Sequence, residues 1–248
     1  MQLILQKTAM YTEWRAPREL ADALVCTWSD AGGEPRAVMP DACIDIVWDG
    51  DQLIIAGPDT RPVSLQADGS FVGIRFRPGV APAFLDIPAS ELLDARIPLR
   101  EFWRGFADEL VERLAHAADP AALLTQALVE RRARAADRDP LVEHLVRTFA
   151  GPRQPNVFDA ADALGVSERT LRRRCEAALG YGPKTLERIL RFRRALRLLH
   201  RGHALADASA IAGYVDQSHF TNECRRLAGT TPATFARAPF SLSANGCN

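Results

Sequence analysis

The feature that most constrains this chain is an internal repeat in its C-terminal part. Four positions (two apolar residues, a glycine and a proline) recur 49 residues later: Leu171, Cys175, Gly180 and Pro183 match Phe220, Cys224, Gly229 and Pro232. A glycine that ends an alanine-rich stretch precedes each set. Several matched positions at one spacing indicate a duplicated supersecondary unit. We therefore predict two copies of one helical unit in this part of the chain.

Each copy has the residue pattern of a helix-turn-helix. In the first copy, Ala161 is small enough for two helices to cross closely, Gly165 suits a left-handed turn, and Ser167 can cap the second helix. In the second copy, Gly213 and Asp216 take the roles of turn and cap. The pattern predicts a short first helix and an exposed second helix in each unit.

The second helix of each unit presents polar side chains outward, where a recognition helix meets the major groove of DNA. The outward residues are Glu168, Arg169, Arg172 and Arg173 in the first unit, and Gln217, Ser218, His219, Thr221, Asn222 and Arg225 in the second. The alternative is a helical bundle with ordinary surface arginines. Two such units in tandem, both closed by Gly-x-x-Pro, favour DNA binding over that alternative.

Residues 140–237 resemble the DNA-binding domain of the AraC family of transcription regulators. The matching segments are Gly213-Tyr214, Asp216-Gln217-Ser218-His219-Phe220 and the run from Cys224 to Pro232. The resemblance implies two recognition helices, joined by a rigid linker helix over about 184–200, in successive major grooves of double-stranded DNA. It also implies RNA polymerase as a partner and base contacts by these residues: Arg169, Arg172, Arg173, Gln217, Ser218, His219, Thr221 and Asn222.

Three departures from the family pattern carry consequences. Cys175 and Cys224 stand where large aromatic residues are usual, which predicts slightly looser packing. Asn222 stands where arginine is common, and asparagine pairs with adenine whereas arginine prefers guanine or a phosphate. Arg174, the third of three consecutive arginines, points away from the outward face, so we expect it to meet a phosphate or solvent.

Charge is distributed unevenly along a chain whose net charge is zero. Residues 1–138 carry 15 Lys and Arg against 21 Asp and Glu, whereas residues 139–248 carry 16 against 10. A basic second part is expected of a segment that binds nucleic acid. The charged, apolar-poor run 131–140 ends in a proline and marks the predicted boundary between the two parts.

Residues 1 to about 80 are predicted to be rich in β-strands. Short apolar or alternating runs at 43–48, 52–56 and 71–76 are separated by Asp-Gly and Gly-Pro turns. Helices are expected to start at Ser90 and to cover 99–117 and 121–134. Further helices are predicted over 141–149, 157–164, 168–179, 184–200, 206–212, 217–227 and after Pro232.

We therefore expect an α+β protein in three segments. Residues 1–138 form a β-rich, barrel-like domain with flanking helices that serves sensing or dimerisation. Residues 139–240 form an all-α domain of two helix-turn-helix units joined by a linker helix, and 241–248 form a disordered tail. The N-terminus lacks the pattern of a signal peptide, and no apolar run reaches about 18 residues, so we expect a cytoplasmic protein without membrane contact.

A small-molecule effector is predicted to bind the first domain in a cavity lined by aromatic residues. The candidate lining residues are Trp28, Cys43, Trp48, Arg75, Phe76 and Trp103. Core packing is the alternative for each aromatic side chain. Arg75 and Arg77 share one face of a strand and are interpreted as an anion site or, with more weight, as a surface pair.

The cysteines provide the alternative hypothesis from another functional class. The chain has five, without a C-x-x-C pair, which indicates reduced thiols: Cys26, Cys43, Cys175, Cys224 and Cys247. Cys43, between Asp41 and Asp45, is the candidate for a thiol that senses oxidants or alkylating agents, although neighbouring carboxylates disfavour the reactive thiolate. A third possibility is a regulator whose first domain only forms a homodimer.

Motifs for catalysis and cofactors are missing from the sequence. There is no G-x-S-x-G elbow, no P-loop and no G-x-G-x-x-G after a strand. Residues 1–138 contain one histidine, His116, so a histidine-rich metal site is not expected. We predict a DNA-binding protein that is not an enzyme and uses neither a metal nor a cofactor.

Overall fold

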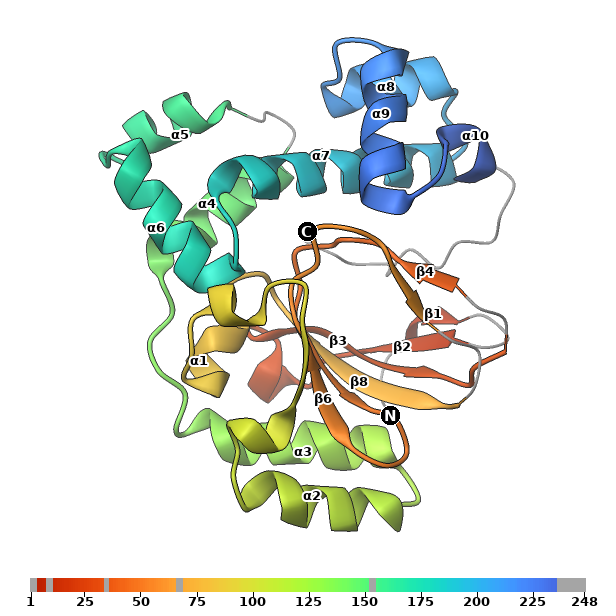
Figure 1. Cartoon of the computed structure of the whole chain (residues 1–248), viewed down its shortest axis with the longest axis vertical. Coiled ribbons are helices and arrows are strands. Elements are labelled where there is room, and N and C mark those ends of the chain that lie inside the picture. The colour runs from red at the N-terminus through yellow and green to blue at the C-terminus, as the bar shows by residue number, and fades with distance from the viewer. Residues whose placement is uncertain (1–3, 8–10, 34–35, 66–68, 152–154, 236–248) are drawn as a thin grey trace.

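The computed structural model describes residues 4–7, 11–33, 36–65, 69–151 and 155–235 (Figure 1). Its first part is built on a seven-stranded antiparallel sheet with the order β1-β2-β3-β8-β5-β6-β9. The strands are β1 (Ile4–Lys7), β2 (Tyr11–Arg15), β3 (Leu24–Asp30), β8 (Phe71–Phe76), β5 (Asp45–Trp48), β6 (Leu53–Ala56) and β9 (Arg96–Pro98). Strands β4 (Arg36–Val38) and β7 (Val63–Leu65) form a separate antiparallel pair.

The strands predicted from alternation are confirmed, and β5 and β6 form the expected hairpin. The run 43–48 enters the sheet only at Asp45. Between the two strands, the Asp49 carboxylate accepts hydrogen bonds from the backbone N–H groups of Asp51 and Gln52, at 2.9 and 2.8 Å. An aspartate at the first turn position commonly closes a turn in this way.

One face of the sheet packs against helix α3 (Pro120–Arg132), and α2 (Phe106–Ala115) packs against α3; both lie below the sheet in Figure 1. Ile46, Ile74 and Phe76 from the sheet and Leu110 and Leu124 from the helices belong to one buried cluster. Because side chains alternate between the faces of a strand, the residues between these ones point to the other face. That face carries polar groups, described below.

The helix predicted over 99–117 is wrong in its first part. Leu99–Glu101 form one 3-10 turn, and α2 begins only at Phe106, after Gly105 at a φ of +70°. A left-handed residue cannot continue a right-handed helix, so the chain turns at Gly105. The helix start expected at Ser90 is also wrong, because Ala89–Leu92 form the 3-10 turn η2.

The second part is helical and follows the sequence prediction to within one residue at nearly every boundary. Its helices are α4 (Pro140–Ala150), α5 (Val157–Ala163), α6 (Glu168–Leu179), α7 (Pro183–His200), α8 (Leu205–Ala212), α9 (Gln217–Ala228) and α10 (Pro232–Phe235). Figure 1 shows α7 running above the sheet, with α5 and α6 at one of its ends and α8 and α9 at the other. The α+β class with two helix-turn-helix units is confirmed.

The two parts share one apolar cluster. Met39 and Ala42, from the β-rich part, belong to the same buried cluster as Val142, Leu171 and Phe192 of the helical part. The domain boundary predicted at 138 stays a prediction and falls in the connector between α3 and α4. The predicted tail, 241–248, and Cys247 lie outside the described residues. None of the described helices is long and apolar enough to cross a membrane.

The connector is fixed to the β-rich part by Asp22. Arg132 and Arg138 both donate to the Asp22 carboxylate, at 2.7 and 2.6 Å, and Arg138 also pairs with Glu143 of α4 at 3.3 Å. Hydrogen bonds from Arg132, together with those from Arg138, lower the pKa of Asp22 to about 2. The carboxylate therefore joins the last helix of the first part, the connector and α4.

This carboxylate gives a pH-dependent contribution to stability. Its folded pKa is below the unfolded value, so the contribution is complete above about pH 5 and is lost as the pH falls toward 2. After allowance for solvent screening of a half-exposed group, Asp22→Asn is expected to lower the free energy of unfolding by on the order of 1 kcal/mol at pH 7. Urea denaturation between pH 3 and 7 measures it. Asp137→Asn, at an exposed position of the connector, is the control and should show no such pH-dependent difference.

Two glycines with the same backbone conformation are expected to respond differently to substitution. Gly165 and Gly180 both have positive φ, and an added Cβ at Gly165 would meet nothing within 4 Å. At Gly180 it would lie 2.8 Å from Pro58 Cγ and 2.9 Å from the Ala89 carbonyl oxygen. Gly165→Ala should destabilise the protein by about 1–2 kcal/mol, the strain of a left-handed alanine, and Gly180→Ala by clearly more. Chemical denaturation measures both losses, and an equal loss of unfolding free energy in the two variants would contradict the close contact of Gly180 with the first part.

Candidate nucleic-acid interface

The first helix-turn-helix unit consists of α5 and α6 and has the local geometry predicted for it. Ala161 is buried between the helices, and Gly165 has a φ of +65° in the turn. The Ser167 hydroxyl accepts a hydrogen bond from the Thr170 N–H at 3.2 Å, which caps α6. Leu171 and Cys175 are fully buried on the inner face. The residues on the opposite face of α6 are thereby fixed toward solvent.

The predicted readers of the first unit are all exposed: Glu168, Arg169, Arg172 and Arg173. Arg172 pairs with Glu176 at 2.7 Å, and this hydrogen bond raises the pKa of Arg172. Arg174 lies off this face, as predicted, and pairs with Asp139, the residue that caps α4, at 3.3 Å. Arg172 and Arg174 thus each have a carboxylate partner within the protein.

The second unit consists of α8 and α9 and repeats these features. Gly213 has a φ of +88°, and the Asp216 carboxylate caps α9 by accepting the His219 N–H at 2.7 Å. Ser209, the small residue of α8, is buried and donates to the Asp216 carbonyl oxygen at 3.2 Å. Tyr214 packs against Phe220 with ring centroids 4.9 Å apart. The duplicated sequence pattern therefore corresponds to a duplicated structure.

Five predicted readers of the second unit are exposed: Gln217, Ser218, His219, Asn222 and Arg225. Thr221 is half-buried, and its hydroxyl donates to the Gln217 carbonyl oxygen at 2.8 Å. The Asn222 side-chain oxygen accepts from Arg225 at 3.3 Å. Thr221 thus presents mainly its methyl group, whereas Asn222 must exchange one contact if it is to pair with a base.

The linker helix α7 holds both units through residues that sequence reasoning did not single out. Leu186, Ile189 and Phe192 are fully buried along it. Arg188 makes two hydrogen bonds to Glu223 of α9, one of them at 2.9 Å. Because a two-donor guanidinium–carboxylate pair fixes orientation as well as distance, it holds α9 against α7. In the sequence, the one indication of this pair is an acidic residue, Glu223, at a position on the inner side of α9.

Further charges on α7 support the same contact. Glu187 accepts from Lys184 at 2.7 Å and from Arg191 at 2.5 Å. The Arg191 guanidinium also lies over the ring of Tyr214, 5.4 Å from its centroid. Burial raises the pKa of Tyr214, so its hydroxyl stays protonated at neutral pH. These contacts connect α7 to the turn of the second unit.

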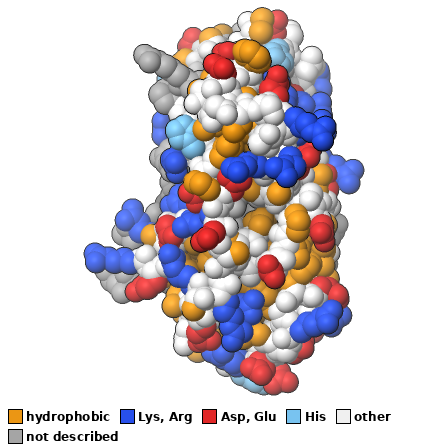
Figure 2. All heavy atoms as spheres, turned by 90° about the vertical axis from the view of Figure 1, so that its left-hand side faces the viewer, with side chains coloured by type: hydrophobic (Ala, Val, Ile, Leu, Met, Phe, Trp, Pro, Cys, Tyr) orange, Lys and Arg blue, Asp and Glu red, His pale blue; other side chains and the backbone are white. Residues whose placement is uncertain are grey.

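The face of the molecule on which α5 and α6 lie is mixed in charge. In Figure 2, Lys and Arg side chains form several groups with Asp and Glu among them. On this face the basic side chains therefore do not form one continuous surface. Arginines on separate helices suit contacts at separate grooves.

The candidate effector residues of the first domain fall into separate buried clusters, and their role in ligand binding stays a prediction. Trp48, Phe76 and Trp103 are buried in the core between the sheet and its helices. Trp103 Nε1 donates to the Phe84 carbonyl oxygen at 3.1 Å. Trp28 and Cys43 belong to a different cluster, on the other face of the sheet. Alternation along the strands places neighbouring residues on opposite faces, which composition alone does not reveal.

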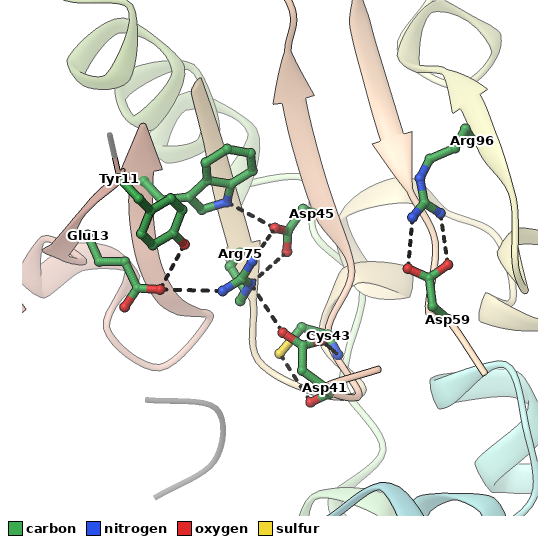
Figure 3. A network of polar contacts seen from close by, with 9 residues as sticks. Tyr11, Glu13, Asp41, Cys43, Asp45, Asp59, Arg75 and Arg96 are labelled. Atoms are coloured by element: carbon green, nitrogen blue, oxygen red, sulfur yellow. Dashed lines mark hydrogen bonds and ion pairs between the residues drawn. The ribbon is translucent and has the colours of Figure 1, made fainter. Parts of the chain in front are cut away.

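Arg75 lies at the centre of a buried polar network on that other face (Figure 3). It donates to Asp45 at 3.1 and 3.0 Å and pairs with Glu13 and Asp41, each at 3.5 Å. Trp28 Nε1 donates to Asp45 at 2.9 Å. Burial raises the pKa of Asp45 to about 6, against the opposing effect of Arg75. The surface-pair interpretation of Arg75 is wrong, because only Arg77, beyond the strand, is partly exposed.

The described cysteines are buried. Cys43 is 5% exposed, and its N–H donates to Asp41 Oδ1 at 2.9 Å. Burial raises the pKa of Cys175 and of Cys224 to about 12 and that of Cys26 further. A raised pKa keeps a thiol protonated and unreactive. Across the described ranges, no group of three or more His, Cys, Asp or Glu residues is placed to hold a metal ion.

Two family models match the chain, and they cover different parts of it. Residues 160–238 match a helix-turn-helix domain, and residues 12–98 match a domain of unknown function (DUF6597). The first match spans both units described above. No curated protein matches the sequence significantly.

Several solved structures are similar to this chain. The C-terminal domain of AraT, a response regulator from Geobacillus stearothermophilus, is 20% identical, with a TM-score of 0.36 over 42% of this chain and 93% of that one. ToxT from Vibrio cholerae is 12% identical, with a TM-score of 0.42 over 84% and 91%. ToxT bound to (E)-4-(8-methylnaphthalen-1-yl)but-3-enoic acid is 10% identical, with a TM-score of 0.44 over 92% and 98%. Similarity at this level does not extend to ligands or residue roles.

Replacing Arg75 is expected to lower the free energy of unfolding far more than replacing Arg77, two residues further along the chain. Arg75→Met leaves the buried carboxylates of Glu13 and Asp45 without their cation, so we expect a loss of about 3–5 kcal/mol in the free energy of unfolding. Arg77→Met is the control, since Arg77 donates to one backbone carbonyl at a partly exposed position, and should cost less than about 1 kcal/mol. Urea denaturation of both variants measures the difference. A small loss in Arg75→Met would contradict the structural role of the network.

Proposed function

We propose that this chain, whose residues 160–238 form an AraC-type helix-turn-helix domain, is a transcription regulator that reads DNA with α6 and α9 in successive major grooves. One observation carries the proposal: two capped recognition helices, each with an exposed polar face, are held on a single linker helix. Major grooves on one side of a duplex are about 34 Å apart. We therefore expect one chain to protect an asymmetric site approaching two helical turns.

The proposed base contacts are divided between the two helices. Arg169, Arg172 and Arg173 are exposed on α6, and arginine pairs preferentially with guanine. On α9, Gln217 and Asn222 are exposed, and their amides suit adenine. Arg172 must exchange its contact with Glu176 to reach a base. The remaining candidates are Glu168, Ser218, His219, Thr221 and Arg225, whose contacts can be to bases, sugars or phosphates.

The first domain is proposed to regulate this binding. It packs against the helical part, so a ligand or a second copy of the chain that changes the first domain can change the position of the recognition helices. A homodimer and RNA polymerase remain proposed partners, and the cytoplasm is the proposed location. The thiol hypothesis gains no support, because Cys43 is nearly inaccessible to reagents.

Selection of bound fragments from a random duplex library tests the readers. Arg173→Ala and Asn222→Ala are each expected to cost about 1–3 kcal/mol at one base position and to relax the preference there. Arg174→Ala is the matched control, because Arg174 pairs with Asp139 and lies off the face. Arg174→Ala should lower the affinity for all DNA sequences equally or leave it unchanged.

Three results would decide against the proposal. One is binding without any enriched sequence. Another is an enriched sequence whose base preferences survive both substitutions. The third is a symmetric half-site pattern read by α6 alone, which would mean that a dimer and not the tandem units contacts the operator. Circular dichroism of each variant separates loss of contact from loss of fold.

A further inference from the structure

One segment of the first domain contacts the ends of both recognition helices. Each of these helices ends in a left-handed glycine, Gly180 after α6 and Gly229 after α9. A Cβ added at Gly180 would lie 2.8 Å from Pro58, and one added at Gly229 would lie 3.5 Å from Pro62. The segment 57–62, which follows β6, therefore reaches the two units at equivalent positions.

This segment is held to its own domain by two carboxylates. Arg96 of β9 makes two hydrogen bonds to Asp59, at 2.9 and 2.7 Å (Figure 3). Asp94 accepts from the Thr60 N–H and from the Thr60 hydroxyl, both at 2.7 Å. Four hydrogen bonds over two residues fix the backbone of the segment. Its exposed side chains therefore have a set position relative to α7 and α9.

A crevice of about 310 Å³ lies between this segment and the two helices. The first domain contributes Thr60 and Arg61, α7 contributes Thr185, Arg188 and Ile189, and α9 contributes Arg226 and Leu227. Three guanidinium groups and two hydroxyl groups thus border one space. Apolar side chains form the rest of its wall. The lining contains no acidic residue.

The positive charge of the crevice is only partly compensated. Glu223 neutralises Arg188 through the pair described above. Arg61 and Arg226 are exposed, and neither has a carboxylate partner among the described residues. Like charges that face one space favour an anion between them. Guanidinium and hydroxyl donors are also the groups that bind phosphate and carboxylate oxygens in proteins.

We propose that this crevice binds a small anionic metabolite through a phosphate or carboxylate group, and that this anion is an effector of DNA binding. The effector role rests on the proposed function, whereas the anion site does not. Arg61 from the first domain and Arg226 from α9 hold the anion from its two sides, and the hydroxyl group of Thr185 is a further hydrogen-bond donor. Ile189 and Leu227 accommodate an apolar part of the ligand.

Binding at this place favours one arrangement of the two parts. An anion that contacts both the 57–62 segment and α9 binds best when they are together, so it stabilises that arrangement. The arrangement also fixes the ends of α6 and α9 relative to each other. By linkage, DNA that requires this relative position strengthens anion binding by the same factor.

Calorimetric titration of the full chain with inorganic phosphate, and separately with citrate, tests the site at constant ionic strength maintained with chloride. We expect saturable binding of one equivalent of at least one anion. Arg61→Gln and Arg226→Gln should each weaken it about three- to tenfold, the range for a charged contact that is partly exposed. Arg104→Gln, an exposed arginine just before α2, is the control and should leave it unchanged. The preferred probe identifies the headgroup as phosphoryl or carboxylate.

The outcomes separate this proposal from the DNA-binding one. In the unsubstituted chain the anion should raise the affinity for the selected DNA site; loss of both anion binding and this effect in Arg61→Gln supports the crevice as an effector site. Anion binding in a chain that selects no DNA sequence would support the site and overturn the regulator. No saturable binding, or equal weakening in Arg104→Gln, would overturn the site. Displacement of the anion by a short duplex of unrelated sequence would also overturn it, because the crevice would then be a contact for DNA phosphates.

Discussion

The ion pair between Arg188 and Glu223 is the contact on which the geometry of the DNA-binding part most depends. It joins the N-terminal part of α7 to the inner side of α9 by two hydrogen bonds. Apolar packing alone permits sliding between helices, whereas a guanidinium–carboxylate pair has one orientation. The distance between the two recognition helices follows from this contact and from the length of α7. DNA recognition by one chain requires that distance to match the groove repeat.

The first domain is ordered by a different kind of interaction. One face of its sheet is covered by helices over an apolar core, while the other carries Arg75 among three carboxylates. Such a network is costly to desolvate and stabilises the protein only while all its members are present. Sites for ligands are therefore more readily found where the first domain meets the helical part, since that surface combines rigid backbone with uncompensated charge.

The sequence predicted the helical part better than the β-rich part, and the reason is physical. A helix-turn-helix is specified locally: Gly165, Ser167 and Leu171 determine the turn, the cap and the buried face within seven residues. The second copy of the repeat supports the same assignments of turn, cap and buried face. In the sheet, the partner of each residue is remote in sequence. Arg75 pairs with Glu13, 62 residues earlier, and no local pattern distinguishes that buried arginine from an exposed one.

The difference between local and remote determinants also explains which site residues could be predicted from the sequence. The readers of α6 and α9 follow from helical spacing, because a buried residue determines which of its neighbours must be exposed. The linker contacts of Glu187 and Arg188 did not follow, since charged residues on a helix are exposed by default. Gly105 was missed for a related reason: spaced aromatic residues continue across it, although the backbone there is left-handed.

The glycines after the recognition helices have two functions, and only one of them is visible in the sequence. A left-handed residue ends α6 and α9, which the Gly-x-x-Pro spacing predicts. The structure adds that the missing side chain leaves room for Pro58 against Gly180 and for Pro62 against Gly229. Because the two proline contacts come from one short segment, displacement of that segment acts on both recognition helices at once. A duplicated DNA-binding unit can thus respond to a single event in the first domain, without a separate signal for each half.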